Sequence, residues 1–188
     1  MARKADRRTL RTQMALRSAL IGLLRRKDYD GITVQEIIDE ANVGRSTFYA
    51  HCSGKDQLLR LSLQILRTEL TEAQQIERSK GAEPGLAFSL PVLEHIREHR
   101  DLYPSLAHGR GRELFMSELK LVVSDLVRSD VAELPAATGV PPEVRVQYVV
   151  GAFMAVLTWW IEHKVRIAPI EVDAMFQQLS QGRRLGRD

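Results

Sequence analysis

The chain has 188 residues, of which 44% are hydrophobic and 27% are charged, and its formal net charge is +3. This composition is that of a globular protein long enough for a small domain and a larger one, and it excludes a chain that is disordered throughout. The single cysteine, Cys52, excludes an internal disulfide framework and fits a reducing cytosol.

Positive charge is concentrated at the amino end. Residues 1–60 contain 12 Lys or Arg against 7 Asp or Glu, so the rest of the chain is net negative. Five cations precede or open the first predicted helix: Arg3, Lys4, Arg7, Arg8 and Arg11. Such an arm can lie along a DNA backbone or enter a minor groove, or it can be a solvated tail. The segment has no apolar core leading to a cleavage site, so we expect no signal peptide.

A short amphipathic helix is predicted after Thr33. Thr33 and Glu36 have the spacing of a capping box, in which each side chain satisfies a backbone donor of the first turn. Apolar residues then recur at the spacing of one buried helix face: Val34, Ile37, Ile38 and Ala41. Asn42, Val43 and Gly44 follow, and Asn and Gly tolerate the backbone angles of a sharp turn.

A second short helix is predicted from Arg45 to His51, with Phe48 as its core contact. Two helices joined by a tight turn form a helix-turn-helix, which presents the first residues of its second helix, here Arg45 and Ser46, to base edges. Arg45 and Lys55 each lie in the first turn of a predicted helix, where the helix dipole disfavours positive charge. Bound phosphates would remove that penalty, although exposed cations also occupy such positions at little cost.

The segment GITVQEIIDEANVGRSTFYAHCSGKDQLL, residues 31–59, resembles the DNA-binding region of the TetR/AcrR family of bacterial transcription regulators. The resemblance implies an all-α fold with an N-terminal three-helix DNA-binding domain and a C-terminal helical domain for ligand binding and dimerisation. It implies phosphate contacts by Thr33, Thr47, Tyr49, His51 and Lys55, and base contacts by Arg45, Ser46, Tyr49 and Ala50. Gly44 differs from the polar residue that is frequent there, so any contact by that residue is absent.

Arg45 is the residue expected to read sequence directly, because a guanidinium can donate two hydrogen bonds to a guanine. Ala50 can meet a thymine methyl group. His51 and Tyr49 lack a neighbouring nucleophile or carboxylate at a catalytic spacing, so we interpret them as phosphate ligands and not as an acid/base pair.

The rest of the chain is predicted to be helical, with helices near 54–79, 90–100, 102–107 and 113–134 and about nine in all. We therefore expect a DNA-binding domain over residues 1–53 and an effector-binding and dimerisation domain over 54–188. The uncharged stretch 148–161 is too short to span a bilayer and predicts a buried helix, partly covered by a second copy of the chain. A turn at Ala168 and Pro169 precedes a last amphipathic helix, and the resemblance implies dimerisation through these two helices.

The body contains candidates for an effector pocket, each of which is more typical of packed core: Tyr103, His108, Phe115, Met116, Phe153, Met154, Trp159 and Trp160. His95 and His99 are one helical turn apart, but no third ligand is evident, so we expect no metal and no cofactor. The region after Met154 faintly resembles regulators of dihydroxyacetone kinase genes, some of which act through protein coactivators.

The sequence thus predicts a cytoplasmic bacterial homodimer that binds a palindromic double-stranded DNA operator and represses transcription until an effector releases it. Repression is implied by the resemblance alone. One alternative is an activator, or a regulator controlled by a protein coregulator instead of a small molecule. The alternative from another class is a helical enzyme or ligand carrier with an incidental basic head, which no catalytic or phosphate-binding motif favours.

Overall fold

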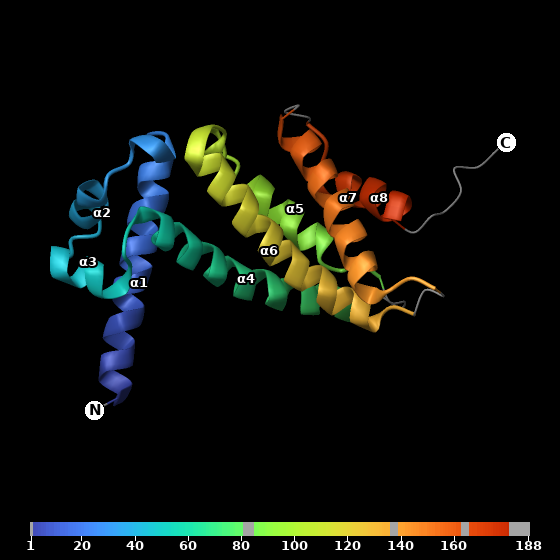
Figure 1. The fold of residues 1–188 in the computed structure, drawn as a ribbon, viewed down its shortest axis with the longest axis horizontal. Coiled ribbons are helices and arrows are strands. Elements are labelled where there is room, and N and C mark those ends of the chain that lie inside the picture. Colours follow the sequence, from blue (N-terminus) through green and yellow to red (C-terminus); the bar gives the residue numbers. More distant parts are fainter. Residues whose placement is uncertain (1, 81–84, 136–138, 163–165, 181–188) are drawn as a thin grey trace. The chain divides into compact units, whose positions relative to one another are not determined.

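The computed structural model describes residues 2–80, 85–135, 139–162 and 166–180, with side chains from residue 9 onward. Within these ranges the chain is all-α and contains eight α-helices and two 3₁₀ turns, where about nine helices were predicted (Figure 1). The helices are α1 (Ala2–Leu24), α2 (Val34–Glu40), α3 (Arg45–His51), α4 (Lys55–Lys80), α5 (Ser89–Glu98), α6 (Gly109–Glu133), α7 (Pro142–Glu162) and α8 (Pro169–Ser180).

Two predicted elements differ from the structure. The expected helix near 102–107 is only a 3₁₀ turn over Pro104–Leu106, which the Ala107 amide closes by donating to the Pro104 carbonyl. Helix α6 begins at Gly109, before the predicted start near residue 113. Gly111 is needed in this helix, since a Cβ there would lie 2.7 Å from Cβ of Tyr29.

The chain forms two compact units. The first unit holds Met1–Leu66 and His99–Leu119, and the second holds Arg67–Glu98 and Lys120–Asp188. Helices α4 and α6 therefore run from one unit into the other. The domain boundary predicted between residues 53 and 54 does not coincide with the limits of these units, since the first unit also contains the first part of α4 and of α6. A division of function at residue 53 stays a prediction.

The core of the first unit lies where α1 packs against α2 and α2 packs against α3. Leu16 and Leu20 of α1, Ile37 of α2 and Phe48 of α3 are at most 1% exposed. Phe48 was predicted to be the core contact of its helix, and the structure confirms it. Cys52 is also buried, and its thiol donates to the Phe48 carbonyl. Burial raises the pKa of this thiol, so Cys52 is a small core residue.

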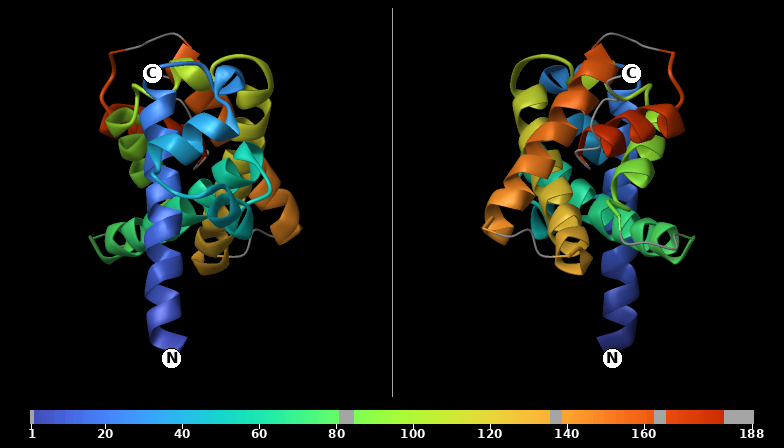
Figure 2. Two further views of the ribbon diagram at one scale, coloured as in Figure 1. Left: turned by 90° about the vertical axis from the view of Figure 1, so that its left-hand side faces the viewer. Right: turned by 90° about the vertical axis from the view of Figure 1, so that its right-hand side faces the viewer.

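The core of the second unit is built on three aromatic rings. Phe88, Phe153 and Phe176 are each fully buried, and their ring centroids are 4.8 to 5.8 Å apart in edge-to-face geometry. Helix α8 accordingly packs beside both α5 and α7 (Figure 2). The buried carboxylate of Asp130 accepts hydrogen bonds from Arg78 at 2.7 Å and from the Phe88 amide at 2.9 Å, which ties α4, α6 and the start of α5 together.

Replacing Phe48 by alanine is expected to reduce the free energy of unfolding by about 3–5 kcal/mol, because it leaves a cavity beneath α3. Urea denaturation measures this change. The exposed neighbour Ser46→Ala is the matched control and should change stability by less than about 0.5 kcal/mol. Equal losses for the two variants would contradict the assignment of Phe48 as the anchor of α3.

Candidate nucleic-acid interface

The predicted capping box at the start of α2 is present. The Glu36 amide donates to the Thr33 hydroxyl at 3.2 Å, and the Thr33 amide donates to the Glu36 carboxylate at 2.8 Å. Lys27, which follows α1, binds the same carboxylate at 2.6 Å. The start of α2 is thus fixed both to its own cap and to the end of α1.

The turn between α2 and α3 has the predicted conformation. Asn42 adopts a left-handed conformation with φ of 50°, which Asn tolerates better than most residues. The Val43 amide then donates to the Ile38 carbonyl at 3.2 Å, which closes the reversal. Gly44 caps α3 in an extended conformation without a side-chain hydrogen bond.

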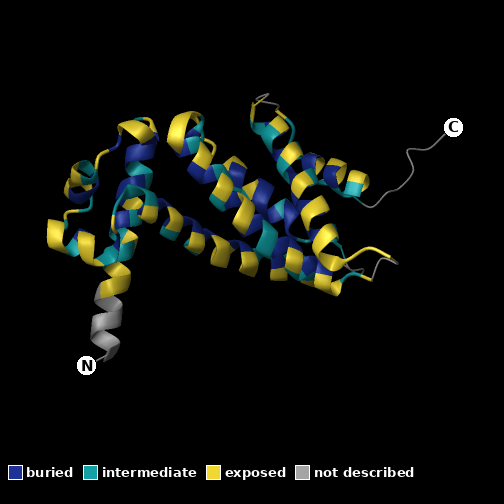
Figure 3. Cartoon of the chain, in the orientation of Figure 1, coloured by how far each residue is buried: buried dark blue, intermediate teal, exposed yellow. Residues whose placement is uncertain are grey.

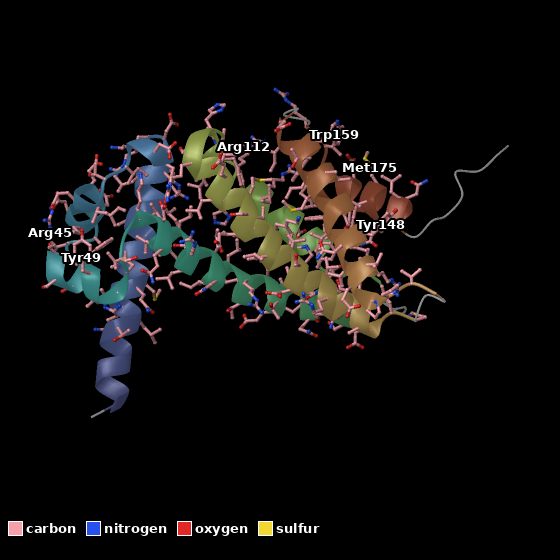
Figure 4. The ribbon with its side chains drawn as sticks, in the orientation of Figure 1. Arg45, Tyr49, Arg112, Tyr148, Trp159 and Met175 are labelled. Carbon is pink, nitrogen blue, oxygen red and sulfur yellow. The ribbon has the colours of Figure 1, made fainter. Side chains whose placement is uncertain are left out.

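The predicted base-reading residues form one exposed surface on α3: Arg45, Ser46, Tyr49 and Ala50. Figure 3 shows that much of this helix is exposed, and Figure 4 places Arg45 and Tyr49 on it. Because Phe48 directs the opposite side of α3 into the core, this surface is available to a ligand. We call these four residues the reading face.

Arg45 has a neutral partner in the free protein. Its Nη2 donates to Oε1 of Gln35 at 3.0 Å, and Nε2 of Gln35 donates to Asp39 at 2.8 Å. The amide accepts a hydrogen bond without cancelling the guanidinium charge. Arg45 therefore keeps the full positive charge that attracts a nucleic acid.

Two carboxylates of α2 are paired with cations that follow α1. Glu36 binds Lys27 at 2.6 Å, and Glu40 binds Arg26 at 2.8 Å. These pairs offset two of the three carboxylates of α2, and the third, Asp39, accepts a hydrogen bond from Gln35.

The five predicted phosphate ligands differ in exposure and in the hydrogen bonds that their polar groups already make. Tyr49 is 52% exposed, and Thr47 and His51 are partly exposed. The hydroxyl of Thr33 is exposed but already takes part in the capping box, where it also donates to Glu36. Lys55 is half-buried, and its ammonium group points into the protein.

Lys55 binds backbone carbonyls of the segment before α2. Its Nζ lies 2.9 Å from the Tyr29 oxygen, 3.1 Å from that of Asp30 and 2.9 Å from that of Ile32, and 4.7 Å from the centroid of the Tyr29 ring. An ammonium has three donors, so the carbonyls account for all of them. They also offset the unfavourable interaction between the Lys55 charge and the dipole of the helix that it begins.

Asp56 binds two partners that the sequence did not single out. One carboxylate oxygen accepts from the buried Tyr29 hydroxyl at 2.6 Å, and the other accepts from Nε of Arg110 at 2.8 Å. The Arg110 amide donates to Asp30 at 3.1 Å. Burial raises the pKa of Asp56, but the hydrogen bonds from Tyr29 and Arg110 outweigh it and lower that pKa overall. Arg110 is 54 residues from Asp56 in the sequence, so no spacing signal marks the pair.

The eight candidate pocket residues divide equally between the two units. Tyr103, His108, Phe115 and Met116 belong to the first unit, where the Tyr103 and Phe115 rings are 5.6 Å apart. Phe153 is a core residue of the second unit, and Trp159 there is 40% exposed. Their role in binding an effector stays a prediction.

Helices α7 and α8 carry exposed apolar side chains. These are Val144, Tyr148, Trp159, Ile170, Met175 and Leu179, of which Figure 4 labels three. Among the described helices only α7, with 21 residues, is long and apolar enough to cross a membrane by length and composition, a test that core helices also pass. The described residues contain no cluster of three His, Cys, Asp or Glu that could hold a metal.

A capped helix, a sharp turn and a second helix with an exposed, cationic first turn define a helix-turn-helix DNA-binding protein. Comparison with known proteins agrees. Residues 16–61 match the model of bacterial regulatory proteins of the tetR family, and residues 86–182 match a transcriptional regulator C-terminal region of the same family. The chain belongs to the TetR family of bacterial transcription regulators.

The individual proteins that the chain resembles share between 13% and 36% identity with it. The HTH-type transcriptional regulator YxbF of Bacillus subtilis strain 168 is 36% identical over 101 residues, which are 50% of this chain but only 27% of that longer protein. A TetR transcriptional regulator from Streptococcus agalactiae 2603V is 26% identical, with a TM-score of 0.63 over 96% of this chain and 99% of its own. The fatty acid degradation regulator FadR of Bacillus halodurans has a TM-score of 0.68 at 13% identity, covering 94% and 97%. The dihydroxyacetone kinase operon activator DhaS has a TM-score of 0.63 at 16% identity, covering 92% and 95%. The last two show a shared fold.

Glu36 makes the stability of α2 dependent on pH. Hydrogen bonds from Lys27 and from Thr33 lower the pKa of Glu36 to about 2, below its ordinary value. A lowered carboxyl pKa stabilises the folded state above the unfolded pKa, and this contribution disappears as the pH falls through the folded value. Glu36→Gln should therefore be less stable than wild type at pH 7, and the difference should shrink between about pH 4.5 and pH 2. Urea midpoints across this range provide the measurement, and a difference independent of pH would contradict it.

Proposed function

We propose that two copies of this chain bind a palindromic DNA operator through their reading faces and repress transcription until an effector releases them. The observation that carries the proposal is the exposed first turn of α3, where Arg45 projects with a neutral amide as its partner. Bacterial helix-turn-helix proteins bind symmetric sites as dimers, with one recognition helix in each major groove. Family membership supports the same role.

The division of labour on α3 follows from exposure. Arg45, with Ser46, Tyr49 and Ala50, reads bases, while Thr47, Tyr49, His51 and the exposed Thr33 bind phosphates. Phosphate contacts set affinity and register, and base contacts set sequence preference. Lys55 is also proposed to bind a phosphate, and in the free chain its ammonium donates to three backbone carbonyls.

The exposed apolar residues of α7 and α8 support the dimer. Tyr148 and Val144 are one turn apart on α7 and are 62% and 55% exposed, while Met175 and Leu179 repeat this spacing on α8. Contiguous apolar surface of this kind is typical of a protein interface. A two-fold axis would join the two helices of one copy to those of the other in a four-helix contact.

Control by an effector is the least constrained part of the proposal. Tyr103 and Phe115 offer paired rings in the first unit, and burial raises the pKa of Tyr103, so its hydroxyl stays a neutral donor. An activator is the second candidate, favoured by the name of one structural neighbour, an operon activator. Titrating metabolites against the dimer on its operator tests small-molecule control; no response, together with a response to a partner protein, would favour a coregulator.

Arg45→Ala should relax base preference at one position of each half-site, since a bidentate arginine–guanine contact is worth about 1–3 kcal/mol of discrimination. Selection from a random duplex library measures this preference. Arg25→Ala is the control, because it also removes one positive charge but from a side chain that is paired with Asp101. This variant should retain the wild-type preference. An unchanged preference for Arg45→Ala would refute the assignment of direct readout.

Tyr148→Arg should dissociate the dimer, because it places two like charges on the proposed two-fold contact. Leu121→Arg is a matched control, since Leu121 is 60% exposed on α6 and lies outside the α7 and α8 surface. Sedimentation equilibrium gives the mass of each variant. A dimeric Tyr148→Arg variant, or a monomeric control, would place the interface elsewhere.

A further inference from the structure

Gln35 connects the two helices of the helix-turn-helix through its side chain. Its amide oxygen, on α2, accepts a hydrogen bond from Nη2 of Arg45, on α3, at 3.0 Å. Its amide nitrogen donates to Oδ1 of Asp39, one turn further along α2, at 2.8 Å. All three residues are exposed, so these contacts lie at the protein surface, where they can influence what Arg45 meets.

The two partners fix which way the Gln35 amide faces. A guanidinium only donates hydrogen bonds and an ionised carboxylate only accepts them, so the amide must turn its oxygen to Arg45 and its nitrogen to Asp39. Asp39 therefore orients Gln35, and Gln35 in turn holds Arg45 from one side. The last side chain in this series of hydrogen bonds is the one proposed to read sequence.

The contact with Gln35 leaves Arg45 able to bind a base. A guanidinium has five N–H donors, of which Gln35 takes one and a guanine edge needs two. Arg45 can therefore keep Gln35 as a partner while it donates to guanine. A free arginine side chain loses much rotamer freedom when it binds, and a partner that already restricts it reduces this loss.

We propose that Gln35 is a positioning residue for base recognition, which holds the Arg45 guanidinium for a guanine and so contributes to the sequence preference of the protein. The proposal rests on the proposed function and adds a residue of α2 to the determinants of specificity on α3. Because Gln35 acts through Arg45, its contribution is confined to the base pair that Arg45 reads. A glutamine that binds adenine itself would contribute at a base pair of its own.

Preference at the base pair that Arg45 reads is the first readout. It is the ratio of the affinities for the operator and for a duplex in which this base pair is replaced in one half-site, so a uniform change in folding or charge cancels. Gln35→Met keeps the length and helix propensity of the side chain but removes both hydrogen bonds. We expect this variant to lower the ratio by about threefold to tenfold, the range for one side-chain hydrogen bond. An unchanged ratio would overturn the proposal.

Gln57→Met is the matched control. Gln57 is also an exposed glutamine of the first unit, and its amide oxygen accepts from the Ser53 amide at 2.6 Å. The same change therefore removes an amide and a hydrogen bond without touching the Arg45 contact. We expect the control to keep the wild-type ratio, and a loss equal to that of Gln35→Met would overturn the proposal.

A double-mutant cycle tests whether Gln35 acts through Arg45. In an Arg45→Ala background, Gln35→Met should have no further effect on preference at any base pair. A further loss of preference in this background would mean that Gln35 reads DNA independently, and it would overturn the positioning role.

A measurement without DNA keeps this proposal separate from the proposed function. The order parameter of Arg45 Nε, obtained from nitrogen relaxation, reports how far the guanidinium moves on the picosecond to nanosecond timescale. It should be lower in Gln35→Met than in wild type and in Gln57→Met, and equal values would overturn the positioning role. If Arg45→Ala relaxes base preference but Gln35→Met does not, this proposal fails and direct readout stands. If Arg45→Ala itself keeps the wild-type preference, direct readout fails and this proposal fails with it.

Discussion

The ammonium of Lys55 on three backbone carbonyls is the interaction on which the DNA-binding unit depends. Helices α2 and α3 have only seven residues each, too short to be stable alone in water. Their angle must be imposed by the core around Phe48 and by the fixing of their two ends. The segment before α2 is fixed through its carbonyls, and the segment after α3 is fixed through Lys55 at the start of α4. Asp56 and Arg110 add further contacts between these segments and α6.

The electrostatics of the unit follow a consistent arrangement. Two carboxylates of α2, Glu36 and Glu40, are paired with the cations Lys27 and Arg26. Arg45 donates to the neutral amide of Gln35, which in turn donates to Asp39. Arg45 thus adds an exposed positive charge to the reading face. A polyanion with readable edges is the partner that matches such a surface.

Local signals explain what could be predicted from the sequence. The Thr33–Glu36 box, the Asn42 turn and the Phe48 anchor each depend on residues within a few positions of one another, so propensity and spacing revealed them. The contacts around Lys55 could not be predicted in this way, because Tyr29 is 26 residues from Lys55 and Arg110 is 54 residues from Asp56. The predicted start of α6 was wrong for the same reason. The glycine at position 111 makes room for Tyr29, which is distant in the sequence, and it does not interrupt the helix. The dipole argument indicated that the Lys55 ammonium needs acceptors, and in the free chain backbone carbonyls are those acceptors.

Guanine methylation interference with the purified wild-type chain tests most directly whether two copies of α3 read DNA through Arg45. Methylation of guanine N7 blocks the bidentate contact that an arginine makes in the major groove. We expect one interfering guanine in each half of a two-fold symmetric site, and loss of both effects in Arg45→Ala. An interference pattern without symmetry, or one that Arg45→Ala leaves unchanged, would contradict direct readout by paired α3 helices.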